Sequence, residues 1–490
     1  MSAVQPQSRD SHSSDRMQQY HRRPGDRIYR PTIVRPWRIL LPIVPKPRTP
    51  ISSSLTLICG FVALIVAGGI LLMLPAASKT GQMTSPIDAF FTATSAVCVT
   101  GLVVKDTADY WSTFGHGVLI ALIQLGGFGF MTSATLFLLA FGRRIGLKQK
   151  ILISESIGIT RLGGLVKVVG LMAGFTIFME AAGAAGLYLL HFSKANSKGV
   201  SIWLSAFQSV SSFNNAGFDL SGKFQSLMGY QTEPWILLVT AGLIIIGGIS
   251  FLVVLDLFRA RWRTARLSLD SKLVLTTTAM LLVVGTAVIL LTEFRNTATL
   301  GNLSIPYRVL NAFFQSVTAR TAGFSTINMG SVANYALFFI VILMFIGGAS
   351  GSTAGGIKVN NFGMLSATIW STLKGREHAG AFGREFSVQQ LNRALTVVLL
   401  SIGFISLALL LLTLTEGSSR FIDLLFETVS AFSTVGLSAD VTPGLTMAGR
   451  LVIMVTMFVG RLGPFTMALA LVQRQQTTTF RYRQETVRTS

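Results

Sequence analysis

Four short stretches of this sequence end in a glycine, and their residue types suit the binding of a cation by backbone oxygens. Glycine has no Cβ and can adopt backbone angles that turn consecutive carbonyls toward one axis. A ring of carbonyl oxygens can replace the hydration shell of a monovalent cation such as K⁺. A helix C-cap would explain one such glycine. The residues expected to supply the carbonyls are Val99, Thr100, Gly101, Asn215, Ala216, Gly217, Thr321, Ala322, Gly323, Thr434, Val435 and Gly436.

The four stretches, which we call the glycine segments, are copies of one pattern. They cover residues 89–102, 205–218, 311–324 and 424–437, and they align without gaps on their glycines. The tenth place before each glycine holds an aromatic residue: Phe91, Phe207, Phe313 and Phe426. Similarity repeated at regular spacing indicates a repeated structural unit, so four glycines in one register favour a common role over four unrelated caps.

A second glycine-rich stretch lies inside the apolar run 336–362. Glycine in a helix interior costs about 1 kcal/mol relative to alanine, so we expect this stretch to unwind. Unwound backbone at membrane depth must line a cavity, where it would act as a gate. Close packing of helices through small residues is the alternative. The residues assigned to gating are Gly347, Gly348, Ser350, Gly351, Ser352, Thr353, Gly355 and Gly356.

Three charged residues stand in apolar surroundings. Arg461 lies in the last apolar run, where an arginine costs about 2.5–3.5 kcal/mol and normally faces a cavity or a partner. We assign it to gating as well, because it would repel a cation and its donors suit the carbonyls of the glycine-rich stretch. The alternative is snorkelling, in which the guanidinium reaches the membrane surface. Arg320 and Glu427 are expected to form a buried pair. Acids expected near the outer mouth are Asp88, Asp106, Asp219, Asp423 and Asp440.

The elements that must position these residues are long apolar runs. Half of the 490 residues are hydrophobic and 12% are charged, against about 25% in soluble domains. Runs of about 20 apolar residues have the length of a membrane span. Eight are present: 55–74, 117–141, 165–190, 235–258, 273–291, 336–362, 394–414 and 451–472. A glycine segment, too short to span, lies between each odd-numbered run and the next.

The sequence therefore predicts an all-α integral membrane protein with eight transmembrane helices and four re-entrant pore loops around a central pore. Four helix–pore loop–helix units would cover residues 51–145, 146–262, 263–375 and 376–473, between a basic, proline-rich tail (1–50) and a C-terminal tail (474–490). The net charge is +21, and Lys and Arg gather in both tails and after the even-numbered runs. This distribution predicts cytoplasmic termini and disfavours nucleic-acid binding. We expect no signal peptide, because the first ~38 residues are polar and basic.

Metal and disulfide chemistry have little support. Cys59 and Cys98 are the only cysteines, and the five histidines are scattered. A membrane-embedded enzyme would need clustered catalytic groups within the runs, where Glu180 and Arg461 are nearly alone. A secondary cation or solute transporter working by alternating access remains an alternative; it would show two inverted halves rather than four similar units.

At this point the chain resembles the Trk/Ktr/HKT superfamily of potassium transporters. The resemblance covers about Leu55 to Gln473 and rests on the single-glycine loops and on the stretches TAGFSTI, FETVSAFSTVGLS and GGASGSTAGGIK. Within that group the chain is similar to the membrane subunit of a bacterial Ktr system, because no extra pair of helices precedes the first unit. The resemblance implies that the four aligned glycines select the ion, that 347–356 is an intramembrane gating loop, and that Arg461 lies opposite it.

The resemblance also implies partners. It implies potassium uptake through a homodimer in the plasma membrane, with Na⁺ as an activator and no organic cofactor in this chain. A cytosolic nucleotide-binding ring that responds to ATP and ADP would regulate it. Glycine at Gly101, where sodium-preferring plant relatives have serine, favours potassium.

Overall fold

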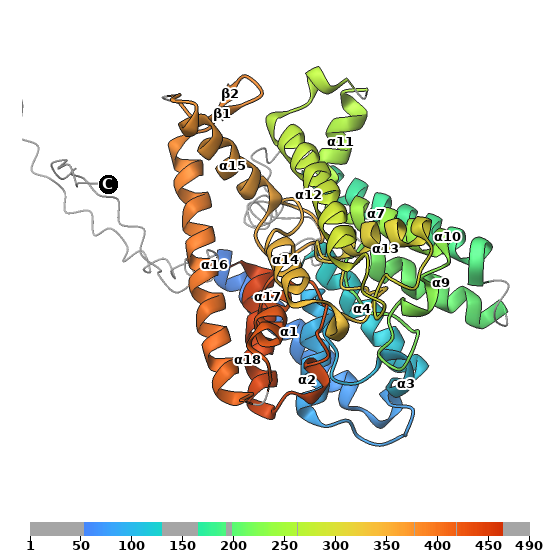
Figure 1. Cartoon of the computed structure of the whole chain (residues 1–490). Helices are drawn as coiled ribbons and strands as arrows, with labels where there is room; N and C mark the ends of the chain where they lie inside the picture. The colour runs from blue at the N-terminus through green and yellow to red at the C-terminus, as the bar shows by residue number, and fades with distance from the viewer. Residues whose placement is uncertain are drawn as a thin grey trace, which may run out of the picture. The chain divides into compact units, whose positions relative to one another are not determined.

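The computed structural model describes residues 53–129, 165–192, 198–261, 263–376, 378–417 and 419–463. The chain divides into two units, residues 1–50 and 51–490, and the description below concerns the second. Both predicted tails and the far ends of the second and eighth apolar runs lie outside the described residues. The described part is almost entirely helical (Figure 1).

Four long helices coincide with the odd-numbered apolar runs. They are α1 (Ser53–Met73), α7 (Leu165–Leu187), α12 (Leu269–Glu293) and α16 (Val388–Thr415), with 21, 23, 25 and 28 residues. At about 1.5 Å per residue each is about 30 Å long or longer, the thickness of the hydrocarbon core. A five-residue π-helical turn, η3 (Tyr188–Phe192), continues α7. Large apolar side chains on these helices are exposed, among them Phe178, Val283 and Leu414, as suits a lipid-facing surface.

Four short helices occupy the even-numbered runs. They are α4 (Thr113–Phe128), α10 (Pro234–Gly248), α14 (Asn334–Phe345) and α18 (Met447–Leu462). Their 12 to 16 residues span about 18–24 Å, less than the hydrocarbon core. After α10 the chain turns by 90° into α11 (Phe251–Arg259). The sequence predicted a break in the sixth run and did not predict this one in the fourth.

The number of spanning helices also differs from the expectation. Among the described residues, three helices are long and apolar enough to cross a membrane, or four if the bent pair α10–α11 is one span. The sequence predicts eight spans. Two causes contribute to the difference. In α1 the apolar stretch that counts, Leu57–Met73, is shorter than 18 residues. The short helices stop at glycines: Gly129 (φ 76°) and Gly463 (φ 84°) end α4 and α18, and Gly247–Gly248 and Gly347–Gly348 lie at the breaks after α10 and α14.

A further short helix lies between each long helix and the next short one. These are α2 (Pro86–Cys98), α9 (Lys198–Phe213), α13 (Ile305–Thr318) and α17 (Phe421–Phe432). Each packs against the long helix before it. Proline in the first turn of α2 and α13 is pre-organised for a helix start. Each glycine segment comprises the end of one of these helices and the turn that follows.

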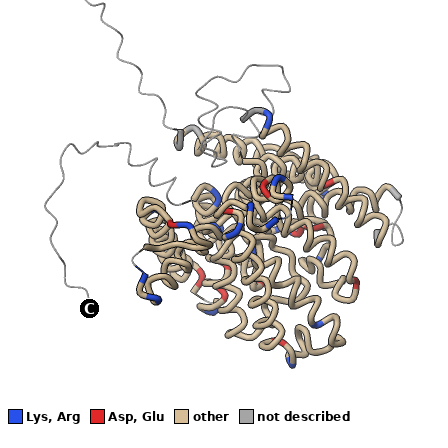
Figure 2. The backbone as a smooth tube through the Cα atoms, turned by 90° about the horizontal axis from the view of Figure 1, so that it is seen from above, with Lys and Arg blue, Asp and Glu red and all other residues tan. Residues whose placement is uncertain are grey.

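The remaining elements are connections. They are α3 (Thr107–Tyr110), α15 (Val359–Leu373), the 3₁₀ turns η2 (Pro75–Ala77), η4 (Met228–Tyr230), η5 (Thr264–Arg266), η6 (Met329–Ser331) and η7 (Thr442–Gly444), and an antiparallel hairpin of β1 (Gly380–Ala381) and β2 (Arg384–Glu385). The elements α11, α15 and the hairpin lie at one end of the helices, and α3 lies toward the other (Figure 1). Charged residues take up little of the described backbone (Figure 2).

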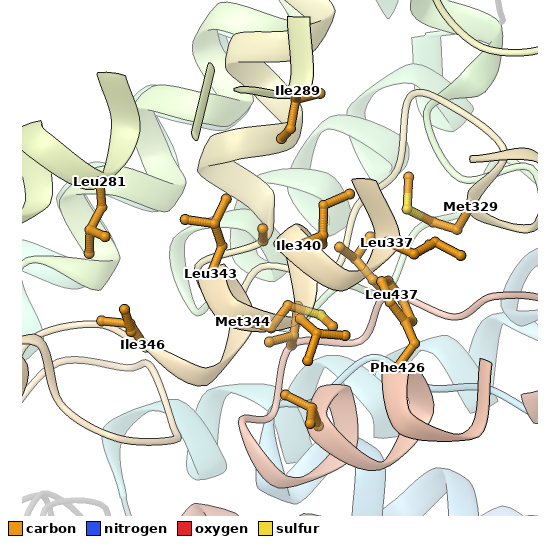
Figure 3. Close-up of a cluster of buried hydrophobic side chains, with 14 of the residues drawn as sticks. Leu281, Ile289, Met329, Leu337, Ile340, Leu343, Met344, Ile346, Phe426 and Leu437 are labelled. Carbon is orange, nitrogen blue, oxygen red and sulfur yellow. The ribbon is translucent and has the colours of Figure 1, made fainter. Parts of the chain in front are cut away.

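The largest apolar cluster surrounds α14. Its Leu337, Ile340 and Met344 are buried, and Phe426 and Leu437 of the fourth glycine segment belong to the same cluster (Figure 3). This packing holds α14, the helix that precedes the glycine-rich stretch, against the fourth glycine segment.

Candidate functional site

The four aligned glycines are neighbours in space and form a closed cycle. A Cβ added to Gly101 would lie 2.9 Å from the Cα of Gly217, and one added to Gly217 would lie 3.1 Å from the Cα of Gly323. A Cβ on Gly323 would lie 3.1 Å from the Cα of Gly436, and one on Gly436 would lie 3.1 Å from the Cα of Gly101. Four backbones, about 110 residues apart in sequence, therefore meet around one point where no side chain fits.

The four turns share an unusual backbone conformation. The glycines have φ between 71° and 96°, and the residue two places earlier also has positive φ: Val99 57°, Asn215 56°, Thr321 78° and Thr434 51°. Positive φ is rare and strained for β-branched residues, at about 1–3 kcal/mol each. The same conformation at the same place in four segments, strained in the three with a β-branched residue, indicates that the carbonyl directions it produces are required.

The amides of these turns are bonded back to the helices before them. Thr100 N donates to Ser95 O, and Val435 N donates to Ser430 O, both at 2.8 Å. Gly101 N and Gly436 N donate to the hydroxyls of the same two serines, at 3.0 and 3.1 Å. Within the described part of the chain, none of the twelve carbonyl oxygens predicted to bind the ion accepts a hydrogen bond. Buried carbonyls are nearly always paired, so these free oxygens are suited to binding a cation.

The glycine-rich stretch is non-helical, as predicted, and forms a folded loop from Ile346 to Lys358. Its two ends pair with each other: Gly347 N donates to Ile357 O at 2.8 Å, and Val359 N donates to Gly348 O at 3.0 Å. The body of the loop docks on the broken end of α10. Ala349 N donates to Gly248 O at 2.9 Å, and the Thr353 hydroxyl donates to Gly247 O at 3.1 Å.

The same loop runs against the fourth glycine segment. A Cβ on Gly355 would overlap the side chain of Thr434, and one on Gly356 (φ 64°) would lie 3.1 Å from the Cα of Ser433. Glycine is required at both positions, because the backbone passes too close to Thr434 and Ser433 for a side chain.

Two cations hold this loop through adjacent carbonyls. Arg461 Nη1 donates to Thr353 O, and its Nη2 donates to Gly126 O at 2.5 Å. Lys358 Nζ donates to Ala354 O at 2.6 Å. Sequence reasoning did not single out Lys358, although a lysine directly after the glycines, within an apolar run, was the available signal. One cation from α18 and one at the end of the loop thus bind neighbouring carbonyls of the loop.

The predicted pair of Arg320 and Glu427 is wrong. Arg320 Nη2 donates to the Thr278 hydroxyl at 3.3 Å, and Glu427 accepts hydrogen bonds from the hydroxyls of Ser438 and Thr442. No ion pair joins the two in the described ranges. Each side chain finds a hydroxyl close to its own segment, which sequence spacing alone does not reveal.

The acidic residues expected at the outer mouth differ from one another in their contacts. Asp88 pairs with Arg450 (2.5 Å) and lies 3.9 Å from Lys105 Nζ. Arg420 pairs with Asp423, and Asp106 accepts a hydrogen bond from Phe224 N at 2.6 Å. Asp219 lies two residues after Gly217 and accepts a hydrogen bond from Ser221 N at 2.9 Å. Burial raises its pKa above the usual value, and the nearby charge of Asp106 acts in the same direction.

Comparisons with known proteins agree on one family for this chain. The profile of the TrkH family, described as a cation transport protein, matches residues 47–482. The potassium/sodium uptake protein NtpJ of Enterococcus hirae is 39% identical over 84% of this chain and 91% of its own length. The Ktr system potassium uptake protein B of Bacillus subtilis is 39% identical over 85% of this chain and 92% of its own length.

A solved structure shares the fold. The potassium transporter TrkH from Vibrio parahaemolyticus superposes with a TM-score of 0.68 at 21% identity, over 89% of this chain and 87% of that one. The resemblance drawn from the glycine segments is confirmed: this chain belongs to the TrkH family of cation transport proteins.

Proposed function

We propose that this chain is the ion-translocating subunit of a potassium uptake system and that the four glycine segments form its selectivity filter. One observation carries the proposal: twelve carbonyl oxygens without hydrogen-bond partners in the described chain belong to four turns whose glycines meet in a closed cycle. Such a ring can replace the water around K⁺. The names of the relatives, potassium/sodium uptake protein and Ktr system potassium uptake protein, support the choice of ion.

The pore is then built from four helix–pore loop–helix units, with the predicted bounds 51–145, 146–262, 263–375 and 376–473. The alternation of long and short helices supports this division, because each unit contains one long helix, one pore helix and one short helix. The breaks that end the short helices would lie at mid-membrane. Backbone freed there is tolerated where it lines a water-filled cavity, which would be the inner half of the pore.

The loop from Ile346 to Lys358 is the gate of this pore. Its position against Thr434 and the charges of Arg461 and Lys358 at its carbonyls support that role. Two unit charges about 8 Å apart repel by about 2 kcal/mol at an effective dielectric constant near 20. A membrane potential of 100 mV supplies about 2.3 kcal/mol per ion. Because the two energies are comparable, the position of the loop and of the two cations that bind it would control the rate.

The same proposal includes a second copy of this chain and a cytosolic regulatory partner. The chain would form a homodimer in the plasma membrane with both termini cytoplasmic, and a cytosolic ring that binds ATP or ADP would move the gate. The exposed basic residues Arg263, Arg266 and Arg384 lie in the η5 turn and the β1–β2 hairpin, the connections that would face that ring. Na⁺ would stimulate uptake without an organic cofactor in this chain.

The test is complementation and flux. Cells that lack potassium uptake are grown at low external potassium with this chain, with and without candidate cytosolic subunits from the same organism. Purified protein in liposomes is then assayed for rubidium and sodium entry with no other solute present. Growth rescue with rubidium entry above that of protein-free liposomes supports the proposal. Entry that requires a co-transported solute would favour alternating access, and absence of rescue and of entry with every subunit would refute it.

A further inference from the structure

A buried carboxylate lies behind the second glycine segment. Glu180 is on the long helix α7, within an apolar stretch long enough to span a membrane, and is 9% exposed. Within the described ranges no Lys or Arg forms an ion pair with it. A carboxylate in such a place needs strong hydrogen-bond donors, and charged side chains within a span usually have a function.

Two amide side chains supply those donors. Asn214 Nδ2 donates to Glu180 Oε1 at 2.8 Å, and Gln124 Nε2 donates to Glu180 Oε2 at 3.3 Å. The amides are also joined to each other, because Asn214 Nδ2 lies 2.9 Å from Gln124 Oε1. The Ser209 hydroxyl donates to the backbone oxygen of Glu180 at 2.6 Å. The cluster therefore ties together α7, the pore helix α9 and the short helix α4.

Asn214 connects this cluster to the proposed filter. It is fully buried and directly precedes Asn215, whose φ of 56° begins the second turn. Its Oδ1 has no hydrogen-bond partner and packs against Gly127, where an added Cβ would overlap it. The amide is thus held by its nitrogen alone, which also reaches Val210 O and Gln124 Oε1, both at 2.9 Å. Glu180 is the carboxylate among these acceptors, and hydrogen bonds to charged groups are stronger than neutral ones, so we expect Glu180 to contribute most to the orientation of Asn214.

The corresponding position differs in the other three glycine segments. It is occupied by Cys98, Arg320 and Ser433. The thiol of Cys98 is free and buried, Arg320 donates to a neutral hydroxyl, and the Ser433 hydroxyl has no partner. Among the described residues, only the second segment is braced at this place by a carboxylate from a long helix.

From this arrangement we infer that Glu180 is a positioning residue that sets the preference of the glycine ring for K⁺ over Na⁺. The inference rests on the proposed function of the ring. A carbonyl ring discriminates between ions through the number and placement of its oxygens. Without Glu180, Asn214 can rotate, the strained turn at Asn215 can relax, and the carbonyls of the second segment move away from the geometry that suits K⁺. Loss of selectivity, rather than loss of folding, is the signature of this role.

The experiment compares rubidium and sodium entry into liposomes for Glu180→Ala, Glu180→Gln, Asn214→Ala and the double alanine variant, at equal amounts of folded protein. Glu180→Ala and Asn214→Ala are each expected to lower the rubidium-to-sodium ratio about tenfold, the size of one strong hydrogen bond. The double variant should add little, because both residues act through one contact. Glu180→Gln keeps the oxygen that accepts from Asn214 and should retain most of the parent ratio.

Glu293 offers a matched control. It is a fully buried glutamate at the end of α12, and its carboxylate accepts hydrogen bonds from Asn296 and from Ala333 N. These contacts join α12 to the start of α14 and do not involve a glycine segment. Glu293→Gln is expected to reduce the yield of folded protein without changing the ion ratio. A drop in the ratio equal to that of Glu180→Ala would show that the ratio reports general loosening, and would overturn the inference.

The outcomes separate this inference from the proposed function. If the parent admits neither ion above protein-free liposomes, the proposed function fails. If the parent prefers rubidium and Gly217→Ser removes the preference while Glu180→Ala and Asn214→Ala keep it, the filter stands and Glu180 serves only packing. Should Glu180→Ala fail to fold, Asn214→Ala decides between the two results.

Discussion

Arg461 donates a hydrogen bond through Nη1 to the carbonyl oxygen of Thr353, across 108 positions of sequence. Through Nη2 it also holds Gly126 O at the end of α4. One guanidinium on α18 therefore joins the loop after α14 to the first short helix. Its planar fork suits two carbonyls at once, which makes it both a latch for the loop and a positive charge beside the proposed pore.

Replacing this arginine should speed transport. We expect Arg461→Ala to raise the initial rate of potassium uptake several-fold, because it removes both a repulsion of about 2 kcal/mol and the latch on Thr353. The ion preference should change little, since it resides in the carbonyl ring. Arg461→Lys keeps the charge but loses the fork, and should be intermediate. Uptake at matched expression is the measurement; loss of transport in a folded Arg461→Ala protein would make the arginine a structural partner only.

Loosening the loop itself should act in the same direction. The Thr353 hydroxyl donates to Gly247 O at 3.1 Å and approaches Phe213 O at 3.4 Å. Thr353→Val keeps the shape and removes the one hydrogen bond that this hydroxyl can donate, worth about 0.5–1.5 kcal/mol, so flux should rise roughly two- to tenfold. Thr368→Val is the control, because that hydroxyl bonds within α15 to Met364 O at 2.8 Å. Equal flux in all three proteins would separate the loop from gating.

Sequence reasoning identified the four aligned glycines that the structure brings together, because their identical spacing can be read without any knowledge of contacts. It did not predict the positive φ of Val99 or Thr434, because β-branched residues avoid that region and only the surrounding packing holds them there. Nor could it place the break in three of the short helices.

The missed breaks have a common structural setting. A Cβ on Gly126, Gly247 or Gly460 would overlap the carbonyl oxygen of Val97, Phe213 or Phe432, respectively. Each of those residues lies four places before a filter glycine, so the short helix packs directly on the end of its own pore helix. Only the sixth run had enough glycines to reveal its break by composition. The prediction that Arg320 pairs with Glu427 failed for a similar reason. Thr278, which accepts a hydrogen bond from Arg320, is 42 positions away in sequence and is brought near by packing.

External acid should weaken potassium uptake through Asp219. Burial and the charge of Asp106 raise its pKa, whereas hydrogen bonds from Ser221 act against them. A raised pKa means that the carboxylate takes up a proton at a higher pH than the usual value of about 4. Its attraction for K⁺ is therefore present above the raised pKa and is lost as external pH falls through it.

The test measures the apparent KM for potassium over external pH from about 8 to about 4. The KM of the parent should rise on acidification. On the alkaline side of this transition, Asp219→Asn should have a KM roughly threefold higher than the parent, the effect of one partly screened charge, with little further change in acid. Asp106 is the acid whose charge acts on Asp219, and Asp106→Asn is the companion variant. A parent-like pH response in Asp219→Asn would assign the effect to another acid.

The ion pair of Asp88 and Arg450 should stabilise the fold and have little effect on transport. It joins α2 to α18 at 2.5 Å, and the two side chains are 9% and 21% exposed. Arg450→Ala leaves a nearly buried carboxylate with only Lys105 at 3.9 Å, so we expect a loss of about 2 kcal/mol. Arg420→Ala, in a pair whose arginine is 57% exposed, should cost less than about 1 kcal/mol.

Thermal unfolding in detergent distinguishes the two variants. The midpoint should fall by a few degrees for Arg450→Ala and hardly at all for Arg420→Ala. The rubidium-to-sodium ratio of both folded proteins should equal that of the parent. Equal midpoints for the two variants would show that the pair between α2 and α18 contributes no more than a surface contact.

The central claim is that Gly101, Gly217, Gly323 and Gly436 together form one cation filter. The most direct measurement is the rubidium-to-sodium flux ratio in liposomes for the parent and for four proteins, each with one of these glycines changed to serine. Because a Cβ at any of the four would meet the neighbouring segment within 3.1 Å, the account predicts that all four changes lower the ratio while the proteins stay folded. A folded variant that keeps the parent ratio at any one of the four positions would contradict a single filter built from all of them.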